Sequence, residues 1–178
     1  MASPTYLELV NDVLVRLRQK EVTSVSDTAY SKLIGKFIND AKRQCEDAYN
    51  WNALSDTLSA VTSPDIFNYV LVGSGQRFRL IDVIDDTSDN VLSSQTTEQM
   101  NRYFLTQVTE KSNPRFYNFN GTDSNGDTQV DLYPVPNGVY NIRFNVIKPQ
   151  PPLSANSDQL KVPSEPVIFG ALARAMAE

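Results

Sequence analysis

The segment 26–51 constrains the fold more than any other part of this sequence. Its apolar residues recur at the i, i+3, i+4, i+7 spacing of a helix that buries one face. These residues are Tyr30, Leu33, Ile34, Phe37, Ile38, Ala41, Cys45, Ala48 and Tyr49. The opposite face carries the charged residues Lys32, Lys36, Asp40, Lys42, Arg43, Glu46 and Asp47. The segment therefore predicts a long amphipathic helix that serves for docking and not for catalysis.

Two more helices are predicted towards the ends of the chain. Thr5 and Glu8 have the spacing of a capping box in front of an apolar stripe, and Ser3 before Pro4 is an equally good start for this helix. Ser26 or Asp27 can cap the long second helix. Ser164 is expected to cap a last helix that is rich in small residues. No stop signal ends this last helix, so we expect either that the helix is cut short or that further residues follow the given sequence.

The middle of the chain has the pattern of a β-structure. After Trp51 the hydrophobic period changes from that of a helix to the alternation of strands. The candidate strands are residues 57–62, 66–72, 77–84, 115–119, 128–133 and 139–147, and a short helix is expected at 96–105. Pro136, Asn137 and Gly138 form a hairpin turn signal. Because turns join most of these strands, we expect an antiparallel sandwich or open barrel.

These elements predict an α+β fold with an inserted region. The proline-rich segment KPQPPLSAN, residues 148–156, leads the chain out of the β-structure. Residues 1–55 and 156–178 are expected to form a helical body, and residues 56–155 an inserted β-domain. A length of 178 residues is enough to bury a sizeable core without disulfides, and the sequence has a single cysteine.

Composition excludes several classes of function. The sequence contains no histidine, which removes the usual general base and the commonest transition-metal ligand. We therefore expect no enzymatic activity, no cofactor and no metal. The formal net charge of −5 argues against tight wrapping of nucleic acid, because that affinity depends on cationic contacts with phosphates. No apolar run is long enough to span a bilayer, so no membrane association is expected.

Three short motifs suggest ligand sites, but each has a simpler interpretation. Asp123, Asn125 and Asp127 resemble part of a calcium loop, and a hairpin tip is favoured because the glycine spacing does not fit. The segment 73–76 resembles a phosphate cradle, yet the absence of a following Lys-Ser/Thr favours a β-turn. The third motif consists of the acidic residues Asp82, Asp85, Asp86 and Asp89. These carboxylates could bind a cation, but a solvated loop is the favoured interpretation.

Several residues are candidates for contacts with other proteins. Trp51 could anchor an interface or fill the space between helix and sheet. Lys42 and Arg43 could contact DNA phosphates or a partner's carboxylates, although a solvated helix face is the simpler interpretation. The small residues of the last helix allow another helix to come close, either in a second molecule or in this one. These small residues are Gly170, Ala171, Ala173 and Ala175. The candidates for a contact with another molecule are Gly170, Ala173 and Ala175. Cys45 is expected to be a core residue.

The run INDAKRQCEDAYNWNAL, the β-rich middle and the late run VPSEPVIFGALARAMAE together resemble the head-to-tail adaptors of short-tailed phages. This family is also called tail tubular protein A or head completion protein. The resemblance implies a structural protein of the virion that forms a ring of about twelve copies. It also implies the portal protein and the tail nozzle protein as partners, and genome DNA passing through the ring without sequence-specific binding. Assembly would take place in the host cytoplasm.

Two further expectations accompany this resemblance. The sequence shows no long exposed apolar seam, so we expect the isolated protein to be largely monomeric and to assemble on its partner. The rival interpretation is a carbohydrate-binding or enzymatic module built on the β-domain. Tyr103, Tyr117 and Tyr133 could then supply the aromatic surface that a sugar requires.

Overall fold

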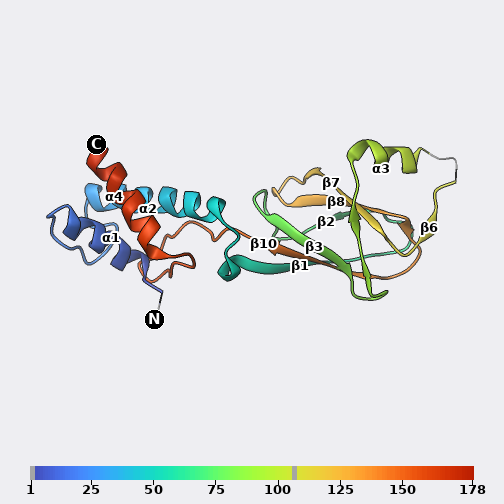
Figure 1. The fold of residues 1–178 in the computed structure, drawn as a ribbon, viewed down its shortest axis with the longest axis horizontal. Helices are drawn as coiled ribbons and strands as arrows, with labels where there is room; N and C mark the ends of the chain where they lie inside the picture. The colour runs from blue at the N-terminus through green and yellow to red at the C-terminus, as the bar shows by residue number, and fades with distance from the viewer. Residues whose placement is uncertain (1–2, 106–107) are drawn as a thin grey trace. The chain divides into compact units, whose positions relative to one another are not determined.

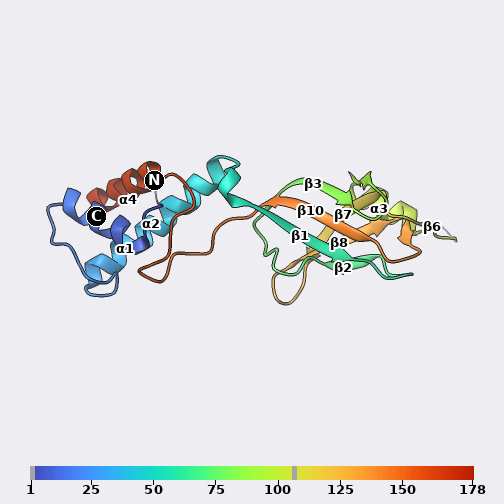
Figure 2. The same cartoon turned by 90° about the horizontal axis from the view of Figure 1, so that it is seen from below.

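The computed structural model describes residues 3–105 and 108–178. The chain forms two compact units, which Figures 1 and 2 show from two directions. The helical unit contains the residues as far as Leu54 together with Pro149–Glu178, and the β unit contains Ser55–Lys148. The predicted α+β class, with N- and C-terminal helices around an inserted β-structure, is confirmed. Residues 149–155 lie in the helical unit and not in the inserted region, because hydrogen bonds hold them to a helix.

Three helices build the helical unit, and Figure 1 shows them close together. They are α1 (Tyr6–Arg16), α2 (Ala29–Ala48) and α4 (Ser164–Ala177), and a single 3₁₀ turn η1 (Asn52–Leu54) follows α2. Each helix packs against the other two. The contact surface is apolar and fully buried in the middle of the unit, where burial of aliphatic side chains supplies most of the stability. Its members include Leu9, Val10, Val13, Ile34, Ile38, Val167 and Ala171.

The helix starts agree only in part with the predicted caps. Thr5 and Glu8 form the complete capping box predicted for α1. The cap of α2 is Thr28, whose hydroxyl accepts the Ser31 N–H at 2.9 Å, so the prediction of Ser26 or Asp27 was wrong. Asp27 is occupied elsewhere: its carboxylate accepts the backbone N–H groups of the preceding loop. Ser164 does not cap α4 either, because it is already the first helical residue and makes no capping hydrogen bond.

The β unit consists mainly of two four-stranded sheets that share one core. The first sheet has the order β1 (Ser55–Val61), β10 (Asn141–Ile147), β3 (Arg79–Asp85), β4 (Asn90–Val91). The second has the order β2 (Asn68–Val70), β8 (Thr128–Tyr133), β7 (Phe116–Thr122), β5 (Ser93–Ser94). Inward side chains such as Phe144, Ile142 and Leu132 fill the space between them and are completely buried. This is the predicted sandwich.

The connections of the β unit differ from the predicted meander. Two short pairs are parallel: β5 with β7, and β6 (Lys111–Ser112) with β9 (Val135–Pro136). The turn at Pro136, Asn137 and Gly138 does not close a hairpin, because β8 and β10 belong to different sheets. The bend is instead fixed by Thr62, whose hydroxyl donates to the Gly138 carbonyl and accepts the Tyr140 N–H. Helix α3 (Thr97–Phe104) falls where a short helix was predicted, with Thr96 as its cap.

The motif around Asp127 is a hairpin tip tied to a second turn, as the two simpler interpretations predicted. The Asp127 carboxylate accepts the N–H groups of Gly73 and Gly75, each at 3.0 Å. Both glycines have positive φ angles, of 78° and 62°, which point their N–H groups at one anion. The amides that could have cradled a phosphate thus bind the protein's own carboxylate. These two hydrogen bonds lower the pKa of Asp127.

The acidic turn between β3 and β4 is not the fully solvated loop that was favoured. Asp85 is completely buried, and its carboxylate accepts the backbone N–H groups of Thr87 at 2.9 Å and Ser88 at 3.3 Å. Asp86 pairs with Arg143 at 2.9 Å. These contacts organise the turn from inside. Among the residues that the structure describes, no group of acidic or cysteine side chains is placed to hold a metal ion.

The tie at Asp127 predicts a stability effect that depends on pH. An Asp whose pKa is lowered by folding stabilises the native state above its unfolded pKa of about 3.9, and this contribution disappears as the pH falls through the folded pKa. We expect Asp127→Asn to lower the melting temperature at pH 7 and to match the wild type at a pH well below 3. Thermal melting at both pH values checks this. Ser124→Ala, in the same tip, is the control; an equal deficit at both pH values would contradict the interpretation.

Candidate docking surfaces of the helical unit

Lys42 lies inside the helical unit, where it fixes the segment that returns from the β unit. We call residues 149–156 the return segment. The Lys42 side chain is 3% exposed, and its ammonium donates to the Glu46 carboxylate at 3.0 Å and to the carbonyls of Gln150 at 2.7 Å and Pro151 at 3.2 Å. These three acceptors match the three protons of a lysine ammonium. The expectation that Lys42 and Glu46 lie on the solvated face of the helix was therefore wrong.

Two further side chains of α2 bind the return segment. Glu46 accepts the Gln150 N–H at 3.2 Å. One turn before Lys42, the Asn39 amide accepts the Leu153 N–H at 2.8 Å and donates to the Leu153 carbonyl at 3.0 Å. Prolines lack an N–H donor, so a segment as rich in proline as this one offers few groups that could form a strand or helix. Side chains of α2 bind the backbone groups of Gln150, Pro151 and Leu153.

The three candidates in α4 lie in different environments. Gly170 faces α2: a Cβ atom added at Gly170 would lie 3.0 Å from the Ala41 Cβ. This contact is within the helical unit, and it requires the smallest side chain. Ala173 is exposed and Ala175 is half-buried. On the same helix, Phe169 is 55% exposed and carries the Arg16 guanidinium 5.2 Å above its ring. The outward face of α4 therefore remains accessible for another molecule.

The remaining candidates lie in the C-terminal half of α2 and directly after its end. Arg43 is exposed. Trp51 is half-buried, donates its indole N–H to the Cys45 carbonyl at 2.8 Å and packs edge-to-face against Tyr49 at a ring separation of 5.0 Å. Tyr49 itself is 62% exposed, although it was predicted to belong to the buried stripe. Cys45 is buried as expected, and desolvation together with the nearby Glu46 charge raises the pKa of its thiol.

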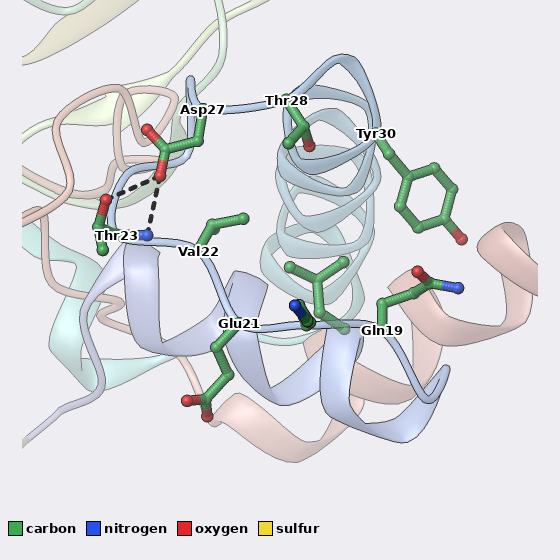
Figure 3. Close-up of a pocket in the computed structure, with 9 residues that line it drawn as sticks. Gln19, Glu21, Val22, Thr23, Asp27, Thr28 and Tyr30 are labelled. Carbon is green, nitrogen blue, oxygen red and sulfur yellow. Dashed lines mark hydrogen bonds between the residues drawn. The ribbon is translucent and has the colours of Figure 1, made fainter.

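The helical unit also has surface grooves. One of them, with a volume of about 690 Å³, lies where α1 ends and α2 begins, and Figure 3 shows its residues. We call it the end groove. Leu14, Val22 and Tyr30 supply its apolar surface. Two smaller grooves, of about 490 Å³ and 390 Å³, contain Lys32 with Lys36 and Glu8 with Asp12 respectively.

The loop beside the end groove is held in place by Asp27. Figure 3 shows this carboxylate accepting hydrogen bonds from the backbone and hydroxyl of Thr23, each at 2.9 Å. The N–H of Ser24 donates to the same oxygen at 2.8 Å. Hydrogen bonds from Ser24 and Thr23 lower the pKa of Asp27, so the carboxylate stays ionised at neutral pH. The wall of the groove is therefore ordered before any partner arrives.

The tyrosines that could have formed a sugar platform are used within the β unit. Tyr117 and Tyr133 are only 8% and 7% exposed. Tyr103 of α3 stacks on Tyr133 with a ring separation of 4.4 Å. These rings hold α3 against the sheet and do not form an open aromatic surface. Among the described helices, none is long and apolar enough to cross a membrane.

The helical unit is ordered and has exposed grooves, which are features that suit a protein that binds other proteins. Residues 4–178 match the family model of the SU10 adaptor protein. The chain belongs to the SU10 adaptor family. Its role is that of a structural head-to-tail adaptor of a phage, and its place is the virion. Such a role is consistent with a non-enzymatic protein. No curated protein matches the chain.

The buried Lys42 and Glu46 predict a large effect of a single substitution. Lys42→Met should destabilise the protein by about 3 kcal/mol, because it leaves the Glu46 charge buried without its partner. Urea denaturation followed by circular dichroism measures this difference. Lys36→Met, on the exposed face of the same helix, should stay within about 0.5 kcal/mol of the wild type. A Lys42→Met variant as stable as Lys36→Met would show that the return segment does not depend on this ammonium.

Proposed function

We propose that the protein assembles into a ring of about twelve copies between the portal and the tail nozzle of a short-tailed phage. The single observation that carries this proposal is the match to an adaptor family over nearly the whole chain, residues 4–178. A protein that connects a head to a tail must bind different partners at different surfaces, and copies joined by one repeated heterologous contact form a ring when the rotation between neighbours closes. Assembly takes place in the host cytoplasm and the ring then remains in the neck of the virion.

The charge of the chain supports a role as a passive wall for DNA. Its formal net charge is −5, so the protein lacks the excess of cations that strong phosphate binding requires. Genome DNA can slide past such a surface without being held. The ring therefore guides DNA through its lumen and makes no sequence-specific contacts.

We place the attachment surfaces on the helical unit. Ala173 is exposed on α4, where its small side chain allows a helix of the portal or of a neighbouring copy to come close; Ala175 is half-buried and less accessible. The end groove adds an aromatic anchor, because Tyr30 is 38% exposed beside it and tyrosine is enriched among residues that dominate binding energies. Arg43 and Trp51 lie at the other end of α2, and we assign them to contacts at the edge of the interface with a partner.

Assembly is expected to need the partner. Most exposed apolar residues are single and scattered over both units, which is normal for a monomer. The purified protein should therefore be monomeric at low micromolar concentration and form rings when the portal ring of the same phage is added. Mass photometry and negative-stain microscopy of the mixture test this expectation. Stable rings of the protein alone would contradict the dependence on the partner, and the absence of any bound ring would contradict the proposed function.

Two substitutions in α4 separate attachment from folding. Ala173→Leu adds volume at an exposed position, so stability should stay within about 0.5 kcal/mol of the wild type while attachment to the portal ring is lost. Gly170→Leu adds a similar side chain against Ala41 and should cost about 1 to 3 kcal/mol. Thermal melting and a portal pull-down of both variants decide the question. An Ala173→Leu variant that binds the portal normally would remove this helix from the interface.

A further inference from the structure

A groove of about 490 Å³ in the helical unit carries two lysines from adjacent turns of α2, Lys32 and Lys36. We call it the basic groove. Residues four apart on a helix project on the same side, so both ammonium groups stand at the same opening. Both side chains are exposed, and neither forms an ion pair with any residue that the structure describes. The opening therefore has two cations available for an external anion.

The other walls of the basic groove are fixed by hydrogen bonds between distant parts of the chain. Asn156 of the return segment accepts the Val25 N–H at 3.1 Å. Asp158 accepts the N–H groups of Ser154 at 2.7 Å and Ala155 at 2.8 Å, and its own carbonyl accepts the Tyr6 N–H at 2.8 Å. The groove thus exists before binding, which reduces the entropy that a partner would lose on ordering it.

A second groove, of about 390 Å³, has the opposite charge. It is lined by Glu8 and Asp12 of α1 together with Ser164 and Ile168 of α4. Glu165, the next residue of α4, is exposed and lies three residues before Ile168, so helix geometry places its carboxylate on the side of the helix that faces this groove. We call this surface the acidic face. Arg16 pairs with Asp12 at 3.3 Å and offsets one of the three negative charges, so Glu8 and Glu165 supply the net negative charge of the acidic face.

The two charged surfaces lie on opposite sides of α1. Tyr6 lines the basic groove, whereas Glu8 and Asp12 line the acidic face. A rotation of about 100° for each residue places Glu8 about 200° and Asp12 about 240° around the helix from Tyr6. One molecule therefore cannot join its own two surfaces. A second copy brings a matching surface of opposite charge to each of them.

We propose that the basic groove of one copy binds the acidic face of the next copy in the ring. The proposal rests on the ring described above and names the contact that closes it. Because the two surfaces differ, the contact is heterologous and repeats around a cycle. Charge complementarity of this kind selects the correct neighbour and orientation. A DNA duplex is the less favoured occupant, because a small concave groove with two cations makes few phosphate contacts and the chain carries a net charge of −5.

Charge reversal tests the contact on the portal ring. One variant is Lys32→Glu/Lys36→Glu, and the other is Asp12→Lys/Glu165→Lys; Glu8 is left intact because it belongs to the capping box. Each variant alone places like charges at every contact between copies, so we expect the number of copies per portal ring, measured by mass photometry, to fall about tenfold or more. An equal mixture of the two variants restores attraction at every contact between unlike copies and should restore the full ring.

Two controls make the outcomes distinct. Lys111→Glu/Lys161→Glu changes the net charge as Lys32→Glu/Lys36→Glu does, outside both surfaces, and should assemble like the wild type. Circular dichroism melting shows that the variants are folded. If the wild type forms rings and each variant alone also assembles fully, the proposed contact is overturned while the ring stands. The same holds if the wild type forms rings and the mixture of the two variants does not recover. DNA binding that is lost only in Lys32→Glu/Lys36→Glu, with normal rings, would assign the groove to DNA. Failure of the wild type to assemble would overturn the ring itself.

Discussion

The buried ammonium of Lys42 is the interaction on which the helical unit depends. A buried ion pair is costly to desolvate and is tolerated only when hydrogen bonds satisfy its remaining groups. Here Glu46 and the carbonyls of Gln150 and Pro151 satisfy all three protons of the ammonium. The buried charge therefore holds the return segment against α2. Asn39 holds Leu153 of the same segment by two further hydrogen bonds, so α2 fixes the chain that leads to α4 at two places.

This arrangement explains how a helical unit can be assembled from both ends of a chain. The return segment is fixed at Gln150 and Leu153, and its end binds the loop between α1 and α2 through Asn156. From there α4 is directed against α2, where Gly170 permits contact with Ala41. The same set of contacts shapes the basic groove. A packing requirement of the fold thus produces the surface that we assign to the neighbouring copy.

Much of the fold could be predicted from sequence because its main elements have clear periods. The alternation in β10 and the capping box at Thr5 both identified real elements. The pairs β5 with β7 and β6 with β9 could not be predicted, since two-residue strands carry no period of their own. Thr28 was missed as a cap because Ser26 and Asp27 are equally good residues for that position.

The docking surfaces were harder to predict than the elements that carry them. Lys42 and Glu46 were assigned to the solvated face on the basis of charge alone. Their position four and eight residues after the buried Ile38 is a signal that could have placed them on the inner face. The basic groove combines Ser24, Lys32 and Asn156, and only the folded chain brings residues so far apart in sequence together. Gly170 was correctly expected to allow another helix to come close. The sequence alone left open whether that helix belonged to the same molecule or to a second one.

A cryo-electron microscopy reconstruction of the neck of the intact phage would show whether the chain forms this ring. We expect a closed ring of this chain between the portal and the tail, in which α1 and α4 of each copy face the Lys32 side of the next. A ring of this chain that touches neither portal nor tail, or a neck that lacks the chain, would contradict it.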